Sequence, residues 1–351
     1  MAYTTINKST DYFNTKLYTG NGSTQSITGV GFQPDWIWAK ERDGSSSHAL
    51  VDSVRGYNKK IMSNATDVES TETTYITSFD SDGFGLGANN GINQSGVTNV
   101  AWNWKAGTTG SGTTTGSGTG KAYSYSVNTT AGFSIVKYIG NGSSGQQIPH
   151  HLGAVPHLIF LKPLDAADHW RVYHHKLHSS APAEYFLRLQ TTGTTGDSSD
   201  IWSDTAPTSS VFTVGNNSGV NANDQEFIAY IFTEKTGYSK FGSFTGNGST
   251  DGTFIYTGQK PKWIMIKRTD SAGSWMIYDA TRDSFNLTEK YLRADLSDAE
   301  ATGSNNRIDI LSNGVKLRAT GSFENASGGS YIYMAFGQSL VGSNNVPCTA
   351  R

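Results

Sequence analysis

Histidines gather in the middle third of the sequence. Seven lie between positions 150 and 178: His150, His151, His157, His169, His174, His175 and His178. Imidazole nitrogens bind metals such as Zn²⁺, and the spacing of the last three would let two of them share one side of a turn. However, no cysteine or carboxylate shares that spacing, and adjacent residues of a strand point to opposite faces. We therefore expect surface and half-buried histidines, with His174 and His175 as candidate ligand contacts and with no metal or cofactor.

Two aspartates form a second candidate site. Asp80 and Asp82, in the stretch FDSDGFGLG (79–87), have the spacing of the first two ligands of a calcium loop. The glutamate that closes such a loop at its twelfth position is missing. Asp-Gly and Asn-Gly pairs between apolar runs are typical of hairpin turns, and Asn313-Gly314 repeats the pattern. We interpret both stretches as turns and retain Asp80 and Asp82 as the metal candidates.

Hydrolytic chemistry would require paired carboxylates or a nucleophile beside a base. No Ser-His-Asp order and no glutamate pair recurs along the chain. The best local cluster is HALVDSVRG (48–56), which holds Asp52 and Arg55, and YDATRD (278–283) repeats the same spacing with Asp279 and Arg282. We expect both pairs to be structural salt bridges and the protein not to be an enzyme.

Tryptophan could bind sugars, because aromatic faces attract C–H-rich surfaces. In WIW (36–38) and WNW (102–104), alternation places both indoles of a pair on one face of a strand. The matching positions elsewhere in the chain are apolar, so these four tryptophans are predicted to be core residues. Trp170 and Trp202 lack that repeated pattern. We predict that these two are exposed ligand contacts.

These residues belong to a sequence unit that recurs three times. LYTGNGS (17–23), YIGNGS (138–143) and FTGNGS (244–249) share a Gly-Asn-Gly phrase, which predicts a hairpin turn near the start of each unit. Each phrase is followed by a proline and by an apolar run that ends in a lysine, and later by a second aromatic run. The three lysines are Lys40, Lys162 and Lys267. Each unit is the size of an ordinary domain.

Composition favours strands over helices. The chain has 40 glycines, 16% charged residues and 12% aromatic residues, a profile that suits short strands joined by tight turns. The only stretches that could form helices are 181–189 and 287–294. We predict an all-β protein of three tandem antiparallel β-sandwich modules.

The predicted modules span residues 1–106, 121–235 and 236–351. Residues 107–120, GTTGSGTTTGSGTG, have no side chain that could anchor a core, so they are predicted to be a flexible linker. Modules two and three are then rigidly juxtaposed, and module one hangs more freely. The polar tail 341–351, with Cys348, is predicted to be an arm that docks on a partner subunit.

Charge and cysteine usage exclude several partners. The net charge is −2 and no cluster of Lys or Arg approaches a nucleic-acid-binding stripe. We expect no membrane insertion, because the chain has no signal peptide and no apolar run of spanning length. A single cysteine permits no intrachain disulfide, which fits synthesis in a reducing cytoplasm.

One family resemblance is visible. The phrase GFQPDWIWAKERDGSSSHALVDSVRG (31–56), continued by SFDSDGFGLG (78–87) and VAWNWKAG (100–107), resembles a repeat domain of marine and cyanobacterial bacteriophages. That domain occurs in tail-fibre-like and other virion surface proteins. The match is close over 12–107 and looser over the third unit. The second unit departs most, with PHLIFLKPLDAADHW (156–170).

The resemblance implies a lectin-like jelly-roll sandwich on the virion exterior, and it carries over no catalytic residues. The first hypothesis is therefore a tail-fibre or adhesin protein, made in the host cytoplasm, that recognises a host-surface glycan through loops of modules two and three. Its partners would be other virion proteins and further copies of itself. The alternative is a capsid decoration or knob protein without a ligand. A glycan depolymerase is a remote third hypothesis.

Overall fold

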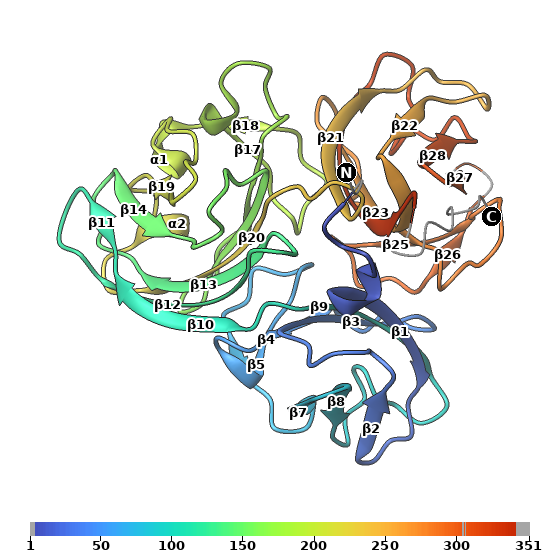
Figure 1. Ribbon diagram of the computed structural model, residues 1–351, viewed down its shortest axis with the longest axis horizontal. Coiled ribbons are helices and arrows are strands. Elements are labelled where there is room, and N and C mark those ends of the chain that lie inside the picture. Colours follow the sequence, from blue (N-terminus) through green and yellow to red (C-terminus); the bar gives the residue numbers. More distant parts are fainter. Residues whose placement is uncertain (1–3, 304, 306, 342–351) are drawn as a thin grey trace.

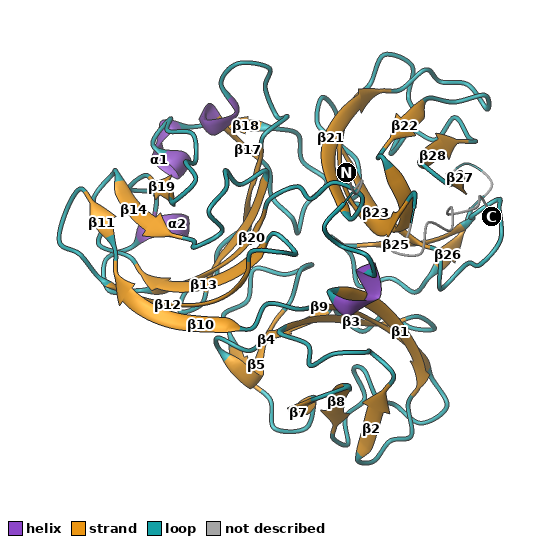
Figure 2. Ribbon diagram, in the orientation of Figure 1, coloured by secondary structure: helices purple, strands orange, loops and turns teal. Residues whose placement is uncertain are grey.

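The computed structural model describes residues 4–303, 305 and 307–341 and consists mainly of antiparallel strands (Figure 2). Strand accounts for 44% and helix for 4% of the described residues, which confirms the all-β class. The helices are single turns: η1 (Ser9–Asp11), η2 (Pro182–Glu184), α1 (Ser199–Trp202) and α2 (Ser218–Asn221). The predicted arm 342–351, including Cys348, lies outside the described residues.

Three lobes surround a common centre (Figure 1). Lobe 1 has a six-stranded sheet in the order β1-β9-β3-β4-β5-β6 and a three-stranded sheet in the order β2-β8-β7. Its strands are β1 (Phe13–Thr19), β2 (Gln25–Thr28), β3 (Trp36–Glu41), β4 (Ala49–Asp52), β5 (Gly56–Ile61), β6 (Ser70–Thr71), β7 (Ile76–Asp80), β8 (Gly83–Leu86) and β9 (Thr98–Trp104).

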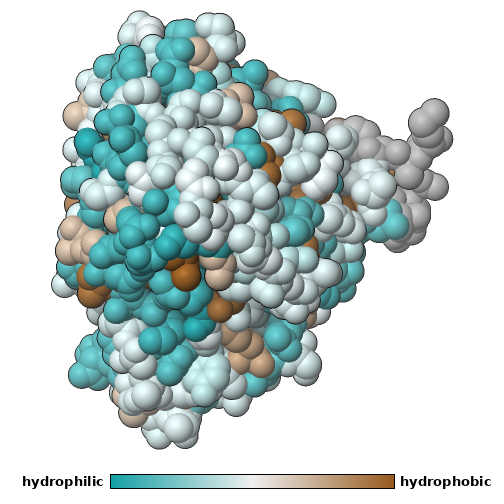
Figure 3. Space-filling view, turned by 90° about the vertical axis from the view of Figure 1, so that its left-hand side faces the viewer, coloured by the Kyte–Doolittle hydropathy of each residue, from teal (hydrophilic) through white to brown (hydrophobic). Residues whose placement is uncertain are grey.

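Lobe 2 extends the same plan. Its sheets have the orders β10-β12-β13-β20-β15-β16, β11-β14-β19 and β17-β18. Its strands are β10 (Thr108–Thr113), β11 (Thr115–Gly116), β12 (Ala122–Asn128), β13 (Phe133–Ile139), β14 (Gln146–Pro149), β15 (Leu158–Pro163), β16 (Arg171–His174), β17 (Tyr185–Phe186), β18 (Gly196–Asp197), β19 (Val211–Val214) and β20 (Glu226–Phe232). Figure 3 shows the outer side of this lobe, where hydrophobic residues are scattered among hydrophilic and neutral ones.

Lobe 3 repeats the strand order of lobe 1. Its sheets have the orders β21-β29-β23-β24-β25-β26 and β22-β28-β27. Its strands are β21 (Ser239–Thr245), β22 (Phe254–Tyr256), β23 (Gln259–Arg268), β24 (Met276–Asp279), β25 (Lys290–Arg293), β26 (Ala301–Thr302), β27 (Ile308–Leu311), β28 (Gly314–Leu317) and β29 (Ser330–Ser339). The stretch 287–294 therefore contains a strand, and 181–189 contains η2 and β17.

The central strands of each large sheet are buried on both faces. On β3, Ile37 and Ala39 pack against the small sheet of lobe 1, whereas Trp36 and Trp38 point to the centre of the molecule. The same alternation holds on β9, so the four tryptophans of the WIW and WNW stretches are buried, as predicted. The core that they enter is shared by all three lobes.

Aromatic rings of different lobes meet in this central core. The Trp36 and Tyr230 rings stack with centroids 4.4 Å apart, and Phe13 stacks on Phe336 at 5.2 Å. Phe232 of lobe 2 and Phe336 of lobe 3 are 5.7 Å apart. Burial of such rings is a large apolar contribution to stability. The expectation that the first module hangs freely is therefore wrong, because lobe 1 supplies tryptophans to the common core.

The tract 107–120 is not a free linker. β10 pairs with β12 along its whole length, and β11 pairs with β14 of the small sheet. Tyrosine rings of β12 lie across the glycines of β10: a Cβ on Gly110 would come within 2.5 Å of Tyr125 Oη, and one on Gly112 within 2.8 Å of Tyr123 Oη. A side chain at Gly110 or Gly112 would therefore have to push its tyrosine ring aside, which favours glycine at these two positions.

The Gly-Asn-Gly phrase is not a hairpin either. β1 belongs to the large sheet and β2 to the small one, so the phrase carries the chain from one sheet to the other. Gly22, Gly142 and Gly248 have φ of 71°, 72° and 64°, the left-handed region that favours glycine. The hairpins predicted at Asp82-Gly83 and Asn313-Gly314 are confirmed, because β7 pairs with β8 and β27 with β28 across those turns.

Candidate functional site

The lobes contact one another head to tail through three interfaces, which we call seams 1–2, 2–3 and 3–1. In each seam, a ring nitrogen of one lobe bonds a backbone carbonyl of the lobe before it. The contacts are Trp170 Nε1 to Met62 O (2.9 Å), Trp275 Nε1 to Arg188 O (3.1 Å) and His48 Nε2 to Arg293 O (3.0 Å). The three seams thus share one geometry, and their side chains can be compared position by position.

Seam 1–2 contains a buried ionic network. Arg55 lies between the carboxylates of Asp52 (Nε–Oδ2 2.5 Å) and Glu69 (Nη1–Oε2 3.1 Å). The hydroxyl of Tyr230, from lobe 2, donates to Asp52 Oδ2 at 2.7 Å. Burial opposes the charge of Arg55, but Asp52, Tyr230 and Glu69 together outweigh it and hold the pKa of the guanidinium above its usual value.

Seam 3–1 repeats that network. Arg282 Nε donates to Asp279 Oδ2, and Arg282 Nη1 donates to Glu300 Oε2 at 2.8 Å. From lobe 1, Trp102 Nε1 donates to Asp279 at 3.1 Å and Arg42 pairs with Glu300 at 2.7 Å. The two Asp-Arg pairs are therefore structural salt bridges, as predicted. They hold lobes together and face no open space.

Seam 2–3 lacks the network. His174 occupies the register position of Asp52 and Asp279, since it pairs with Leu158 as they pair with Trp36 and Trp263. Three residues later, Leu177 stands where the other seams have an arginine. Thr195 corresponds to Glu69 and Glu300, because the backbone N–H of each of the three donates to a carbonyl of the next lobe. The acceptor is Thr269 O for Thr195 (3.1 Å), Leu164 O for Glu69 and Arg42 O for Glu300. The side chains of His174, Leu177 and Thr195 thus include no carboxylate and no guanidinium.

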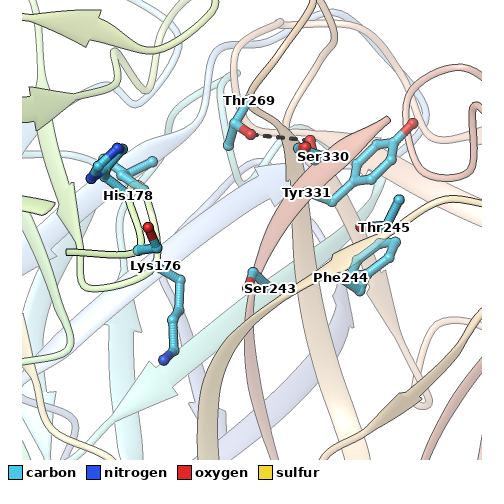
Figure 4. A pocket seen from close by; sticks show the side chains of 10 residues that line it. Lys176, His178, Ser243, Phe244, Thr245, Thr269, Ser330 and Tyr331 are labelled. Carbon is cyan, nitrogen blue, oxygen red and sulfur yellow. Dashed lines mark hydrogen bonds between the residues drawn. The ribbon is translucent and has the colours of Figure 1, made fainter. Parts of the chain in front are cut away.

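A cleft opens at this seam. It has a volume of about 600 Å³ and runs between the loop that follows β16 and the strand ends of lobe 3 (Figure 4). Lobe 2 contributes Lys176, Leu177, His178 and Ser179. Lobe 3 contributes the ends of β21, β23 and β29, with Ser243, Phe244, Thr245, Thr269, Ser330 and Tyr331. The cleft lies where Leu177 replaces the buried arginine of the other seams.

The lobe 2 side of the cleft provides nitrogen donors. Lys176 is exposed, and no described carboxylate forms an ion pair with it. His178 stacks on Tyr185 with centroids 4.9 Å apart, and its Nδ1 accepts the Ala181 N–H at 3.1 Å. Because Nδ1 accepts this N–H, Nε2 is the ring nitrogen that is left to donate. Lys176 and His178 thus bring nitrogen donors to the lobe 2 side of the cleft.

The lobe 3 side of the cleft is a hydroxyl surface on an aromatic base. Phe244 and Tyr331 stack with centroids 4.9 Å apart and an interplanar angle of 8°. The Tyr331 hydroxyl donates to Ser322 O and accepts the Ala326 N–H, so it is used within the lobe. Ser243 and Ser330 are exposed beside these rings. Hydroxyls next to a half-exposed ring can bind a polar ligand that also has C–H faces.

The prediction that Trp170 and Trp202 are exposed ligand contacts is wrong. Trp170 enters the central core, where it stacks near Tyr230 at 6.3 Å. Trp202 lies in α1 and packs edge-on against Tyr173 at 6.0 Å in the core of lobe 2. Both indoles are at most 1% exposed.

His174 and His175 lie at the seam, behind the cleft. His174 is buried, with Nε2 3.2 Å from Tyr333 O, and its Nδ1 accepts the Lys176 N–H at 3.1 Å. His175 Nε2 is 2.9 Å from Phe241 O. Burial lowers the pKa of His174 well below its usual range and that of His175 to about 4, so both rings are neutral. They position the Lys176 loop, and they are not in the lining of the cleft.

The sequence analysis kept His174 and His175 as ligand contacts, did not retain His178, and did not single out Lys176 or the serines of the cleft. Loop and strand-end residues of ordinary type give no local signal. The three-fold sequence repeat does contain one, because Leu177 aligns with Arg55 and Arg282. A position that is arginine in two units and leucine in the third marks the seam that differs.

Asp80 and Asp82 lie at the turn between β7 and β8. Asp82 accepts the backbone N–H groups of Gly29 (2.9 Å) and Gly31 (2.6 Å), which lower the pKa of its carboxyl. This carboxylate therefore closes a turn within lobe 1. Within residues 4–303, 305 and 307–341, no three His, Cys, Asp or Glu side chains are grouped as metal ligands would be.

The comparisons with known proteins identify the family. In the described part of the chain, no helix has the length and apolar character needed to span a bilayer. No match to the chain was found among curated proteins or among solved structures. The family described as "Domain of unknown function (DUF7483)" matches residues 8–339, from the residue before η1 to the end of β29, and the chain belongs to that family.

Proposed function

We propose that this chain is a bacteriophage virion protein on the particle surface, and that the cleft of seam 2–3 attaches the particle to a glycan of the host surface. The sequence resemblance supports the virion assignment. The repeated pairing of a six-stranded with a three-stranded sheet supports the reading of the lobes as three tandem β-sandwich modules of the jelly-roll kind. Such modules hold their loops rigidly, as recognition requires.

The cleft is the observation that carries the glycan-binding part of the proposal. It is open, it is lined mainly by hydroxyl and nitrogen donors, and it has one stacked aromatic pair. Sugars present hydroxyls at their rims and C–H groups on their faces, so such a lining is complementary to them. The cleft contains no carboxylate pair, which speaks for binding and against glycan cleavage.

A cleft-filling variant tests this proposal. Ser330 is exposed at the start of β29 and lines the cleft, so an indole in Ser330→Trp would occupy part of the volume. Ser209→Trp, at an exposed loop position of lobe 2, is the matched control. On a glycan array, Ser330→Trp is expected to bind at least about ten-fold more weakly than the native chain, and Ser209→Trp to bind as the native chain does. Equal binding by both variants would refute a glycan site in this cleft.

Capsid decoration is the second candidate function. The observation in its favour is the shared central core, because a rigid closed unit suits a mechanical role. Localisation of the chain in cryo-EM density of the intact particle separates the two. Density at the tail periphery supports attachment, and density on the capsid lattice supports decoration. Other virion proteins and further copies of the chain are the proposed partners in both cases.

A further inference from the structure

We infer that the ligand of the seam 2–3 cleft is an acidic saccharide, whose carboxylate or sulfate group is held by Lys176 and His178. This inference rests on the proposed glycan-binding function and narrows it to one chemical class. It is carried by the charge of the lining and by a comparison of the cleft with the other two seams.

The lining has a cation and no anion. Lys176 is its only charged residue, and the ten residues around the cleft include no aspartate or glutamate. Asp270, which follows Thr269 in the sequence, is paired with Arg268 at 2.9 Å. An exposed ammonium group and a fixed N–H donor on one loop, without a competing carboxylate in the lining, favour an anionic group on the ligand.

The matching loops of the other seams have a different arrangement. Lys176 is the second residue after β16. The second residue after β4 is Val54 and the second after β24 is Thr281, and each of these is followed directly by the buried arginine. Seam 2–3 therefore has its cation one position earlier, in an exposed side chain instead of a buried one. The buried arginines satisfy carboxylates of their own lobe, whereas Lys176 is free to satisfy one that comes from outside.

The floor of the cleft has also lost its charges relative to lobe 2. Ser243 and Ser330 occupy the register positions of Lys137 and Glu226, which form an ion pair at 2.8 Å on the sheet of lobe 2. In lobe 3 the same surface is neutral and rich in hydroxyls. Sugar hydroxyls can hydrogen-bond to this floor while the acidic group binds the loop on the other side.

Calorimetric titration of the full chain with three defined hexasaccharides tests the inference. The probes are a sulfated heparin-derived hexasaccharide, a carboxylated oligogalacturonate and neutral maltohexaose. We expect an acidic probe to bind at least about ten-fold more tightly than maltohexaose, since charge-assisted hydrogen bonds are about twice as strong as neutral ones. The two acidic probes distinguish sulfate from carboxylate as the recognised group.

Two substitutions locate the effect. Lys176→Gln removes the cleft cation. It is expected to weaken binding of the acidic probe about ten-fold and to leave the affinity for maltohexaose unchanged. Lys8→Gln removes an exposed lysine that pairs with Asp11 far from the cleft in sequence, and it is expected to change neither. If Lys176→Gln and Lys8→Gln weaken the acidic probe equally, the binding is non-specific charge attraction and the inference is wrong.

The failure of this inference differs from the failure of the proposed function. If maltohexaose binds as tightly as the acidic probes and Ser330→Trp abolishes that binding, the inference of an acidic ligand is wrong but glycan attachment stands. Binding of every probe and every array glycan unaffected by Ser330→Trp would overturn both.

Discussion

At the residue scale, each lobe buries the lysine that ends its central apolar run. Lys267 Nζ donates to Gly273 O at 2.7 Å and to Thr192 O of lobe 2 at 3.0 Å. Lys40 and Lys162 donate to carbonyls in the same way. Burial lowers the pKa of each of the three to about 8. The repeated lysine is therefore a buried cation that donates to backbone carbonyls near its strand end, and in lobes 1 and 3 it also reaches carbonyls of a loop.

A buried acid in lobe 3 leads to a prediction for pH dependence. Burial raises the pKa of Glu324 from its usual 4.5 to about 8, and Tyr278 donates to it at 2.9 Å. Between these values the folded chain keeps a proton that the unfolded chain has released, so this group's contribution to stability falls as the pH rises from 4.5 to 8. We expect Glu324→Gln to match the native chain near pH 4.5. At pH 8 it should be more stable, by about 4 kcal/mol.

Urea unfolding at pH 4.5, 6.5 and 8 measures this difference. Comparison with the native chain at each pH cancels the titration of the buried histidines, such as His48 with a pKa of about 3. A difference in unfolding free energy that does not change with pH would contradict the prediction.

At the element scale, each Gly-Asn-Gly crossing is held by one buried asparagine from far along the chain. In lobe 1, Asn93 Oδ1 accepts the Asn21 N–H at 3.0 Å, and its amide donates to Ser23 O and Gly87 O. Asn221 and Asn325 make the same bonds in lobes 2 and 3. The sequence predicts a turn at this phrase, because Asn and Gly are turn residues. It cannot predict a crossing, because the partner lies about 70 residues away and only the fold brings it close.

Replacement of this buried asparagine should lower the free energy of unfolding more than replacement of an exposed asparagine nearby. Asn93→Ala leaves the Asn21 N–H and the Ser23 carbonyl without their side-chain partner, and it removes one of the two amide donors to the Gly87 carbonyl. We therefore expect a loss of about 2–4 kcal/mol in unfolding free energy. Asn90→Ala, three residues earlier and exposed, is the control and should cost less than about 0.5 kcal/mol. Similar unfolding midpoints for the two variants would show that the crossing does not depend on Asn93.

The ionic seams make a second prediction at this scale. Arg282→Leu leaves Asp279 without its buried guanidinium and removes one partner of Glu300, so it should cost about 3–5 kcal/mol. The triple variant Asp279→His, Arg282→Leu and Glu300→Thr copies the side chains of seam 2–3. We expect it to be more stable than Arg282→Leu alone, because no buried carboxylate remains unpaired. Equal or greater destabilisation in denaturant titrations would show that the network cannot be exchanged as a unit.

At the scale of the whole molecule, the shared core makes the lobes interdependent. Trp36 touches rings of lobe 2, and Phe13 of lobe 1 touches Trp263 and Phe336 of lobe 3. The sequence predicts that Trp36 and Trp38 are buried, but it does not predict which residues they pack against. The run WIWAKE is apolar on both faces of its strand, and such a pattern shows burial on both sides without naming the partner of either.

The same limit explains the errors at Trp170 and Trp202. Trp170 follows DAADH, a polar stretch that is typical of a surface loop, yet its indole reaches a carbonyl of lobe 1 that is 108 residues away in the sequence. Pairings within a strand, a hairpin or an Asp-x-x-Arg turn were predictable, because their partners are local. Pairings between lobes were not.

Calorimetry can test the interdependence. We expect one unfolding transition for the full chain, in which Trp36→Ala lowers the stability of all three lobes together by about 3–5 kcal/mol. The isolated segment 1–106 should bind a hydrophobic dye, because its four central tryptophans would face solvent. Separate transitions for the lobes would show that the central core does not couple them.

The covalent linkage of three head-to-tail lobes has a consequence for stoichiometry. Three identical subunits closed by a three-fold axis must repeat every feature of one interface in the other two. A single chain is free of that constraint. Two of its seams can therefore keep their buried salt bridges, while the third lacks them and contains the cleft. The chain should then titrate to one molar equivalent of ligand, where a symmetric trimer of the same shape would take three.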